Sequence, residues 1–401
     1  MSDAKRPKAS IFFFDGWISI AVSVMGAATE LQARGYDVDI YFNTPPNSVM
    51  PPNLPTGIAL HEHRPWTRFL TSKIMNYFRR RTLEQATRIQ ADDSVRSKNA
   101  RLRALAKAVA GFIEIPQFAL YCRRRVKSTD LAIAFDMNSL MAMDIALPRL
   151  VPFVYWSLEI WRLADLQDPF QRRLKLHELK RLPQGRAVVV QSAVRRAIIE
   201  EDLPAPLDNY VEVPNAPAHP MPASLRRNFY SSRFPIPDDV WVVLHSGFIS
   251  TSLMSLEIAQ TVPSWPDDFV LIFHERQKRD PSEPYIEAVQ KAGGQRTYLS
   301  LDPVPFEDVD NVYAGADIGL VCYQTAEANE ATAWTSSGKL VYYLRHAMPI
   351  IVVLPECPPL LQEWDCGIWV SEVASIGAAL KKIAADYDGY STRARGLWSA
   401  V

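Results

Sequence analysis

Residues 335–354 read TSSGKLVYYLRHAMPIIVVL and contain the signals of a helix followed by a buried strand. Small hydroxyl residues, which are good helix N-caps, lead into Gly338, and an apolar stretch with helical spacing follows. Pro349 separates this stretch from the β-branched run 350–354, which is typical of a strand covered on both faces. The segment therefore predicts a helix-to-strand unit of a parallel α/β sheet.

The start of this helix has the residue types that proteins use to hold phosphate. Gly338 lets the backbone approach a ligand closely, and Ser336 and Ser337 stand beside it. The free N–H groups of a first helical turn and the positive end of the helix dipole attract anions. Lys339 adds a point charge suited to phosphate oxygens. Capped helices with an early lysine are common, so the motif needs support from its surroundings.

Short apolar runs alternate with helical segments in two series along the chain. The first series lies at 10–14, 38–42, 131–135, 152–156 and 187–191, and the second at 241–246, 269–274, 318–323 and 350–354. This alternation favours parallel sheets with helices on both faces. The interval 213–239 between the series holds six prolines, which is typical of a domain connection.

We therefore predict an α/β protein of two doubly wound, Rossmann-like domains that face each other across a cleft. The first domain covers residues 1–217 and the second covers residues 218–401. The last segment, 386–401, leaves the second domain and could return to the first. The length of 401 residues suits two domains of ordinary size.

Composition limits the class of protein. Apolar residues make up 48% of the chain, charged residues 22%, and the net charge is zero, so electrostatics argue against a nucleic-acid partner for the whole chain. The four cysteines are scattered without a CxxC pair, and we interpret them as reduced packing residues of a cytoplasmic protein. The apolar N-terminal run is interrupted by Asp15 and continues as a strand, helix and strand, so it predicts no signal peptide. No stretch has the length and apolarity of a membrane span.

One segment departs from this neutrality. Residues 64–127 carry 16 Lys or Arg against 4 Asp or Glu, with aromatic residues interleaved. Two interpretations stay open: a solvated pair of helices, or a surface for anionic membrane lipid or a polyanionic acceptor. Nucleic acid is disfavoured because no binding motif accompanies the charge.

Six motifs of the second half occur in a characteristic order. They are AVVVQSAVRRAIIEE (187–201), VPNAP (213–217), LHSGFIS (244–250), VYAGADIGLVCY (312–323), KLVYYLRHAMPIIV (339–352) and LLQEWDCGIWV (360–370). In this order they resemble the GT-B glycosyltransferases, especially the large retaining family (family 4-like, group 1) that uses nucleotide sugars. The resemblance implies a GT-B fold. It also implies metal-independent, retaining transfer of a sugar from a nucleotide-sugar donor to a glycan or lipid-linked glycan acceptor.

The resemblance and the neighbouring residues give a candidate donor site. Its residues are Gly247, Phe248, His274, Arg276, Glu330, Ser336, Ser337, Gly338, Lys339 and Tyr342. Family members place two glutamates eight positions apart, where this chain has Trp334 and Tyr342. Tyr342 could replace only part of the ribose contact of the second glutamate, and Glu327 or Glu330 could substitute from the preceding loop. The basic residue that often follows the glycine turn is absent, and Arg276 or Lys278 could supply its charge.

The candidate acceptor residues belong to the first domain. Asp15, Gly16 and Trp17 follow the first strand, where this fold brings a loop to its substrate. Glu159 lies just beyond the strand 152–156, and we take it as the candidate catalytic or acceptor-binding carboxylate. No metal site is expected, because Asp308 and Asp310 in EDVDN are interpreted as helix-start residues.

Two alternatives to a transferase remain on the sequence alone. One is a catalytically silent GT-B scaffold in a glycan-assembly complex, which the tyrosine at position 342 favours. The other is a GT-B nucleotide-sugar epimerase. In either case we expect a cytoplasmic protein, with a peripheral contact to the inner membrane surface if residues 64–127 bind anionic lipid.

Overall fold

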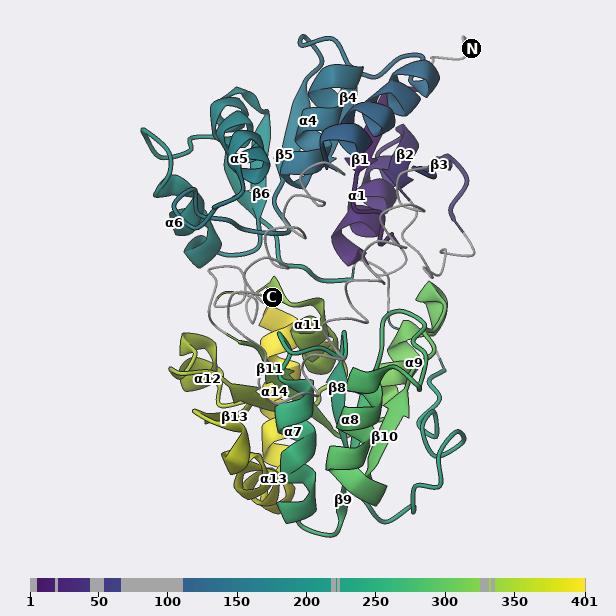
Figure 1. The fold of residues 1–401 in the computed structure, drawn as a ribbon, viewed down its shortest axis with the longest axis vertical. Coiled ribbons are helices and arrows are strands. Elements are labelled where there is room, and N and C mark those ends of the chain that lie inside the picture. Colours follow the sequence, from purple (N-terminus) through teal and green to yellow (C-terminus); the bar gives the residue numbers. More distant parts are fainter. Residues whose placement is uncertain are drawn as a thin grey trace, which may run out of the picture. The chain divides into compact units, whose positions relative to one another are not determined.

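The computed structural model describes residues 6–18, 21–43, 54–65, 111–217, 221, 224–324, 332 and 336–400. These residues form two compact units, each built on a sheet of parallel strands (Figure 1). The first unit holds most of the chain up to Val213, and the second holds Pro214–Val401 together with the stretch Ser19–Gly26. The sequence places the boundary after residue 217, in the same proline-rich interval.

The first unit contains a seven-stranded sheet with the order β3-β2-β1-β4-β5-β6-β7. Its strands are β1 (Lys8–Phe13), β2 (Asp37–Asn43), β3 (Ile58–His63), β4 (Leu131–Phe135), β5 (Phe153–Trp156), β6 (Ala187–Val190) and β7 (Tyr210–Glu212). All adjacent pairs are parallel. The strand order reverses between β1 and β4, which is where doubly wound sheets form their ligand sites.

Helices connect these strands, and their ends follow from the sequence. They are α1 (Val22–Ala33), α4 (Asp136–Ala146), α5 (Pro169–Arg181) and α6 (Ala193–Glu200), and residues 111–125 are also helical. At the start of α5, Asp168 accepts a hydrogen bond from the N–H of Phe170 at 2.8 Å, and proline occupies the first helical position. Helices α4 and α5 pack against each other.

The second unit contains a six-stranded sheet with the order β10-β9-β8-β11-β12-β13. Its strands are β8 (Trp241–Ser246), β9 (Phe269–His274), β10 (Thr297–Ser300), β11 (Ile318–Cys322), β12 (Ile350–Val353) and β13 (Gly367–Val370). Successive residues of β9 alternate between two apolar cores: Val270 and Ile272 belong to one, and Leu271 and Phe273 to the other. This alternation explains why the strand is apolar throughout.

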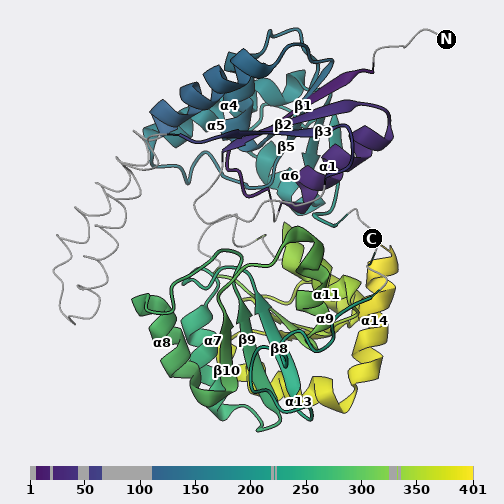
Figure 2. The ribbon, with the colours of Figure 1, turned by 90° about the vertical axis from the view of Figure 1, so that its right-hand side faces the viewer.

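Helices cover both faces of this second sheet (Figure 2). Helices α9 (Val309–Ala314), α11 (Gly338–Arg345) and α14 (Tyr387–Ala400) lie on one face, and α7 (Ser255–Thr261), α8 (Pro284–Gly293) and α13 (Ile376–Ala385) lie on the other, with α12 (Pro359–Trp364) beside β13. Helix α14 packs on α11, α12 and α13, and its Ala394 and Leu397 belong to the core of this unit. The sequence left open a return of this segment to the first domain.

The predicted fold class, two Rossmann-like α/β domains, is confirmed. Each of the nine apolar runs is a strand, with ends within two residues of the predicted ones. Four strands lack a predicted counterpart, namely β3, β7, β10 and β13. No helix in the part of the chain that the structure describes has the length and apolar character needed to cross a membrane.

Candidate functional site

The first turn of α11 presents backbone N–H groups without a side-chain cap. Ser337 is the N-cap residue, but its hydroxyl makes no hydrogen bond to the helix and instead accepts one from the Tyr323 hydroxyl at 2.8 Å. The residue before it is also fixed, because the side-chain amide of Asn215 donates to the carbonyl of Ser336 at 3.0 Å. The N-terminus of α11 is therefore positioned while its N–H groups stay available to an anion.

Lys339, in this first turn, is buried, and the described part of the chain offers its amine no counter-ion. Its side chain is 2% exposed, and its Nζ has no hydrogen-bond partner among the residues that the structure describes. The amine lies over the aromatic ring of Tyr323, whose centroid is 4.7 Å from Nζ. Burial lowers the pKa of the amine to about 7. A buried, unpaired amine is unfavourable by itself, so the arrangement suits an anion that would supply the missing partner.

Gly247 brings the turn after β8 close to this amine. Its φ of 132° is unfavourable for residues with a side chain, and its N–H donates to the carbonyl of His274 at 3.0 Å. A Cβ atom at this position would lie 3.2 Å from Leu253 Cδ1 and 3.6 Å from Lys339 Nζ. The glycine therefore meets both a conformational and a spatial requirement.

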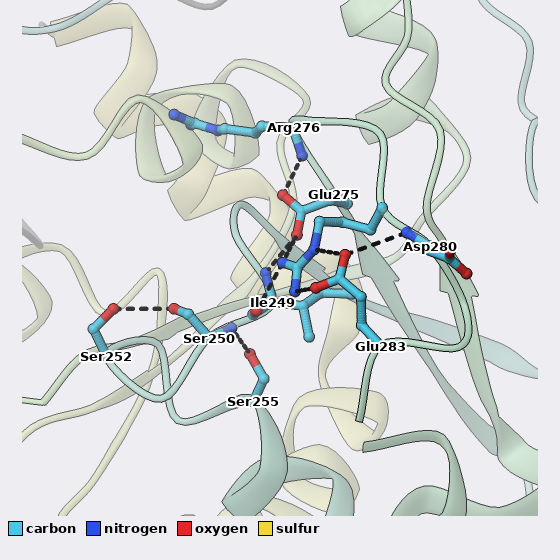
Figure 3. Close-up of polar contacts among 9 residues, drawn as sticks. Ile249, Ser250, Ser252, Ser255, Glu275, Arg276, Asp280 and Glu283 are labelled. Carbon is cyan, nitrogen blue, oxygen red and sulfur yellow. Dashed lines mark hydrogen bonds and ion pairs between the residues drawn. The ribbon is translucent and has the colours of Figure 1, made fainter. Parts of the chain in front are cut away.

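The loop after β9 places a second cation beside the helix start (Figure 3). The buried carboxylate of Glu275 accepts hydrogen bonds from the N–H groups of Ile249 at 2.9 Å and Arg276 at 2.8 Å, and from the Arg279 guanidinium at 3.1 Å. These bonds fix the turns after β8 and β9 together. The Arg276 side chain extends away from this cluster, and a Cβ atom at Gly338 would lie 3.9 Å from its NH2.

A pocket lined by apolar side chains adjoins Arg276. Tyr342 of α11 stacks on Tyr313 of α9, with ring centroids 4.6 Å apart and an angle of 6° between the rings. The Tyr342 hydroxyl is buried and has no hydrogen-bond partner in the described part of the chain. His274 also lines the pocket, and its Nδ1 is 2.9 Å from Ser300 Oγ. Burial lowers the pKa of His274 to about 3, so its ring is neutral at physiological pH.

In the first unit, three carboxylates follow three neighbouring strands. Asp15 follows β1, Asp136 follows β4, and Glu159 lies beyond β5. Asp136 is buried, adopts a left-handed φ of 62°, and accepts hydrogen bonds from the N–H groups of Leu158 at 2.6 Å and Glu159 at 3.0 Å. Burial, and then the charges of Glu159 and Asp15, raise the pKa of Asp136 well above its usual value. Asp136 therefore fixes the turn from which the exposed Glu159 projects.

Solved structures resemble this chain over almost its full length. A sucrose-phosphate synthase from Thermosynechococcus elongatus matches with a TM-score of 0.61 and 13% identity, over 97% of this chain and 92% of the other. WaaG, a glycosyltransferase involved in lipopolysaccharide biosynthesis, matches with a TM-score of 0.59 and 13% identity, over 98% and 95%. The fold is GT-B. No family model matches the sequence, and no curated protein matches it.

A third solved structure, the UDP-GlcNAc 2-epimerase from Neisseria meningitidis bound to UDP-GlcNAc, matches with a TM-score of 0.52 and 11% identity, over 97% of this chain and 94% of the other. At these identities the likeness shows the fold. The chemistry has to be argued from the residues of this GT-B chain itself.

The structure brings most of the predicted donor residues of this GT-B chain into one region. Gly247, Arg276, Ser337, Gly338 and Lys339 surround the start of α11. Ser336, His274 and Tyr342 lie next to them, and Phe248 follows Gly247 in the same turn, partly buried. Glu330, with Glu327 and Trp334, lies outside the described residues.

The predicted acceptor residues lie together at the end of β1. Gly16 adopts a left-handed φ of 78°, and Asp15 and Trp17 on either side of it are half-buried. The sequence reasoning did not single out Asp136, although this residue directly follows a predicted strand, as Asp15 does. It also did not single out Glu275 or Tyr313, whose roles depend on partners distant in sequence.

The two aspartates of EDVDN lie at a helix start, as predicted. Asp308 precedes α9 and accepts a hydrogen bond from the Asn311 side chain at 3.0 Å. Asp310 is buried, and its Oδ1 lies 2.9 Å from His346 Nε2. Among the residues that the structure describes, no group of three or more His, Cys, Asp or Glu is arranged to hold a metal ion.

Proposed function

We propose that this GT-B protein is a glycosyltransferase that moves a sugar from a nucleotide-sugar donor to a hydroxyl group of a glycan or lipid-linked glycan. One observation supports the proposal: the amine of Lys339 is buried at the first turn of α11, beside Arg276 and Gly247, and has no hydrogen-bond partner among the residues that the structure describes. A diphosphate placed there would pair with this amine and with the N–H groups of the helix start.

The arrangement suits the chemistry of glycosyl transfer. As the bond between the sugar and the diphosphate breaks, negative charge grows on the leaving oxygen. Lys339, Arg276 and the positive end of α11 would stabilise that charge, which supports a metal-independent reaction. The retaining outcome rests on the resemblance of the sequence motifs alone.

We place the acceptor in the first unit. Asp15, Gly16 and Trp17 follow β1, and Glu159 projects from a turn that Asp136 fixes. A carboxylate at this position could accept a hydrogen bond from the acceptor hydroxyl. We propose a cytoplasmic enzyme that meets its acceptor at the inner membrane surface.

Thermal unfolding in the presence of nucleoside diphosphates tests the donor site. UDP, GDP and ADP should be compared at 1 mM with the wild type and with Lys339→Met. We expect one of them to raise the melting temperature of the wild type, since a ligand at about 100 times its Kd stabilises a protein by about 2.7 kcal/mol. The Lys339→Met variant should show a much smaller increase. No increase with any of the three would contradict the proposal and favour a silent scaffold.

A nucleotide-sugar epimerase is the second candidate, because an epimerase is among the structures of the same fold. Proton NMR of the matching nucleotide sugar, incubated with the protein alone, distinguishes the two. An epimerase inverts a ring carbon without any acceptor, whereas a transferase leaves the sugar configuration unchanged and releases nucleoside diphosphate when an acceptor is added.

A further inference from the structure

We propose that Glu275 is a positioning residue of the donor site. It holds the backbone of Arg276 against the turn after β8, so that the Arg276 cation is in place for the second phosphate of a nucleoside diphosphate. The inference rests on the proposed function and names a further residue on which donor binding depends. It follows from the hydrogen bonds of a buried carboxylate beside the proposed anion site.

The Glu275 carboxylate joins the turn after β8 to the turn after β9. Glu275 is the first residue after β9 and is 0% exposed. Its Oε2 accepts a hydrogen bond from the N–H of Ile249 at 2.9 Å, and its Oε1 accepts one from the N–H of Arg276 at 2.8 Å. Its own N–H donates to the carbonyl of Ser300 in β10 at 2.9 Å. The residue is therefore anchored on the sheet, and its side chain holds one peptide N–H of each turn.

Arg279 completes the anchor on the turn after β8 (Figure 3). Its guanidinium donates to Glu275 Oε2 at 3.1 Å and to the carbonyl of Ile249 at 3.3 Å. Ile249 is thus held on both sides, with its N–H bonded to Glu275 and its carbonyl bonded to Arg279. The same guanidinium also donates to the two oxygens of Glu283, at 2.9 Å and 2.7 Å. Charge-assisted hydrogen bonds of this kind keep the turn in one position, against which Arg276 can be held.

Charge alone argues against a carboxylate at this place. A phosphate bound by Arg276 would be repelled by the negative charge of Glu275, and water screens a buried charge only weakly. Burial raises the pKa of Glu275, whereas the hydrogen bond from Ile249 and the charge of Arg279 lower it. An ionised Glu275 would therefore weaken phosphate binding through its charge and strengthen it through positioning. These two effects have opposite signs, so a neutral variant distinguishes them.

Isothermal titration calorimetry with UDP, GDP and ADP, and with their monophosphates UMP, GMP and AMP, tests the inference. For the nucleoside that binds, the Kd of the monophosphate divided by the Kd of the diphosphate measures the contribution of the second phosphate. We expect a ratio of at least about tenfold in the wild type, as for one contact between charged groups.

Glu275→Gln should lower this ratio by at least threefold. The variant keeps the size of the side chain, but an amide nitrogen does not accept hydrogen bonds, so the bridge between the two turns is broken. If the charge of Glu275 were its main effect, the ratio would rise instead. A ratio that rises or stays unchanged in Glu275→Gln, or a wild-type ratio near one, would overturn the inference while nucleotide binding remains. No binding of any nucleotide to the wild type would overturn the inference together with the proposed function.

Two further variants separate positioning from charge and from general stability. Glu283→Gln removes a negative charge from the other partner of Arg279 but leaves the bonds of Glu275 in place, so its ratio should not fall below that of the wild type. Arg276→Met removes the cation itself and should lower the ratio at least as much as Glu275→Gln does. The double variant should match Arg276→Met, because Glu275 acts through Arg276. A merely structural role of Glu275 would weaken both nucleotides equally and leave the ratio unchanged, and a further loss in the double variant would overturn the assignment.

Discussion

In the proposed donor site, Lys339 would couple the binding of a diphosphate to pH. Burial lowers the pKa of its amine to about 7, so the amine loses its proton as the pH rises above 7. A bound diphosphate favours the charged form and raises this pKa again. Binding above pH 7 therefore requires the uptake of a proton, whereas well below pH 7 the amine is already charged.

The first prediction follows from this linkage. Between pH 7 and pH 9 the Kd of the nucleoside diphosphate should rise by up to tenfold per pH unit, because the charge of the phosphate is constant in this range. Titration calorimetry in buffers of different ionisation enthalpy should show the uptake of up to one proton. Lys339→Met should show neither effect, and Lys382→Met, which alters an exposed lysine of α13, should behave as the wild type. A pH-independent Kd in the wild type would refute the coupling.

The second prediction concerns the glycine that faces Lys339. Gly247→Ala should lower the stability by about 1–3 kcal/mol, because φ is 132° there, and should also weaken nucleotide binding by crowding the amine. Gly294→Ala is the matched control: its φ of 64° is also unfavourable, but a Cβ atom there meets nothing within 4 Å. Urea unfolding and calorimetry should show reduced stability in both variants and reduced affinity only in Gly247→Ala.

The sequence predicts which residues form the candidate donor site, but it does not predict how deeply these residues are buried or what they contact. The order of motifs around Gly338 points to Gly247, Arg276 and Lys339, since turns after strands and helix starts are recognisable locally. The burial of Lys339 depends on side chains that the sequence does not place, such as Tyr323. The left-handed backbone conformation of Asp136 could not be predicted from the sequence either, because aspartate adopts this conformation only in specific contexts.

At the level of secondary structure, the strands that the sequence missed share one property. β3 and β7 are the two edges of the first sheet, and β10 and β13 are the two edges of the second. Edge strands are covered less completely than central ones, so they tolerate polar residues and can be short. β3 reads IALHEH and β7 has only three residues. A search for continuous apolar runs finds central strands and overlooks edges for this physical reason.

Helices α9 and α11, which carry the stacked Tyr313 and Tyr342, are joined by a buried polar cluster. The side chain of Asp310 in α9 is buried, with 1% of the residue exposed. It accepts a hydrogen bond from the Arg345 guanidinium at 3.3 Å, and its Oδ1 lies 2.9 Å from His346 Nε2. Removing one partner of a buried ion pair is strongly destabilising, so this carboxylate is hard to replace.

The third prediction follows from this cluster. Asp310→Asn should lower the free energy of unfolding by about 3–5 kcal/mol, because it removes one charge of the buried ion pair between Asp310 and Arg345. Urea unfolding measures this loss, and Asp267→Asn, at a fully exposed position, serves as the control and should change stability by less than about 0.5 kcal/mol. A loss below about 1 kcal/mol for Asp310→Asn would mean that the cluster does not hold the two helices.

For the whole molecule, the fold was predicted from the order of strands and helices along the chain. At 13% identity to the matching structures, few individual residues are shared, yet the fold is similar over 97–98% of this chain. Fold follows from this pattern because burial on both faces of parallel sheets constrains residue type rather than residue identity. Which donor and acceptor the protein binds depends on individual side chains, so the alternation of strands and helices does not determine their identity.

The basic segment 64–127 is a property of the whole chain, because it concentrates positive charge in a molecule of zero net charge. Most of it lies outside the described residues, and the described part includes the helical residues 111–125. That helix exposes apolar side chains, with 49% of Phe112 and 47% of Leu120 accessible to solvent. Its last turn exposes three consecutive arginines, 123–125. Apolar and cationic groups exposed on one helix suit the surface of an anionic membrane.

The last prediction is that this helix binds anionic vesicles in a salt-dependent way. Each basic residue near an anionic surface contributes about 1 kcal/mol, so exchanging residues 123–125 for glutamine should weaken binding by about two orders of magnitude. Co-sedimentation with vesicles containing phosphatidylserine measures the binding. It should weaken from 10 mM to 100 mM salt, because the Debye length falls from about 30 Å to about 10 Å.

The matched control for this triple variant changes three exposed cations of the second unit, Lys381, Lys382 and Arg395, to glutamine. This control removes the same net charge. If only the net charge of the protein attracted it to the vesicles, binding would weaken equally in both variants. We expect the control to sediment like the wild type, because the attraction arises from the local concentration of charge and from the adjacent apolar side chains. Equal sedimentation with neutral and anionic vesicles, or equal losses in the two variants, would leave a solvated helix as the interpretation of this segment.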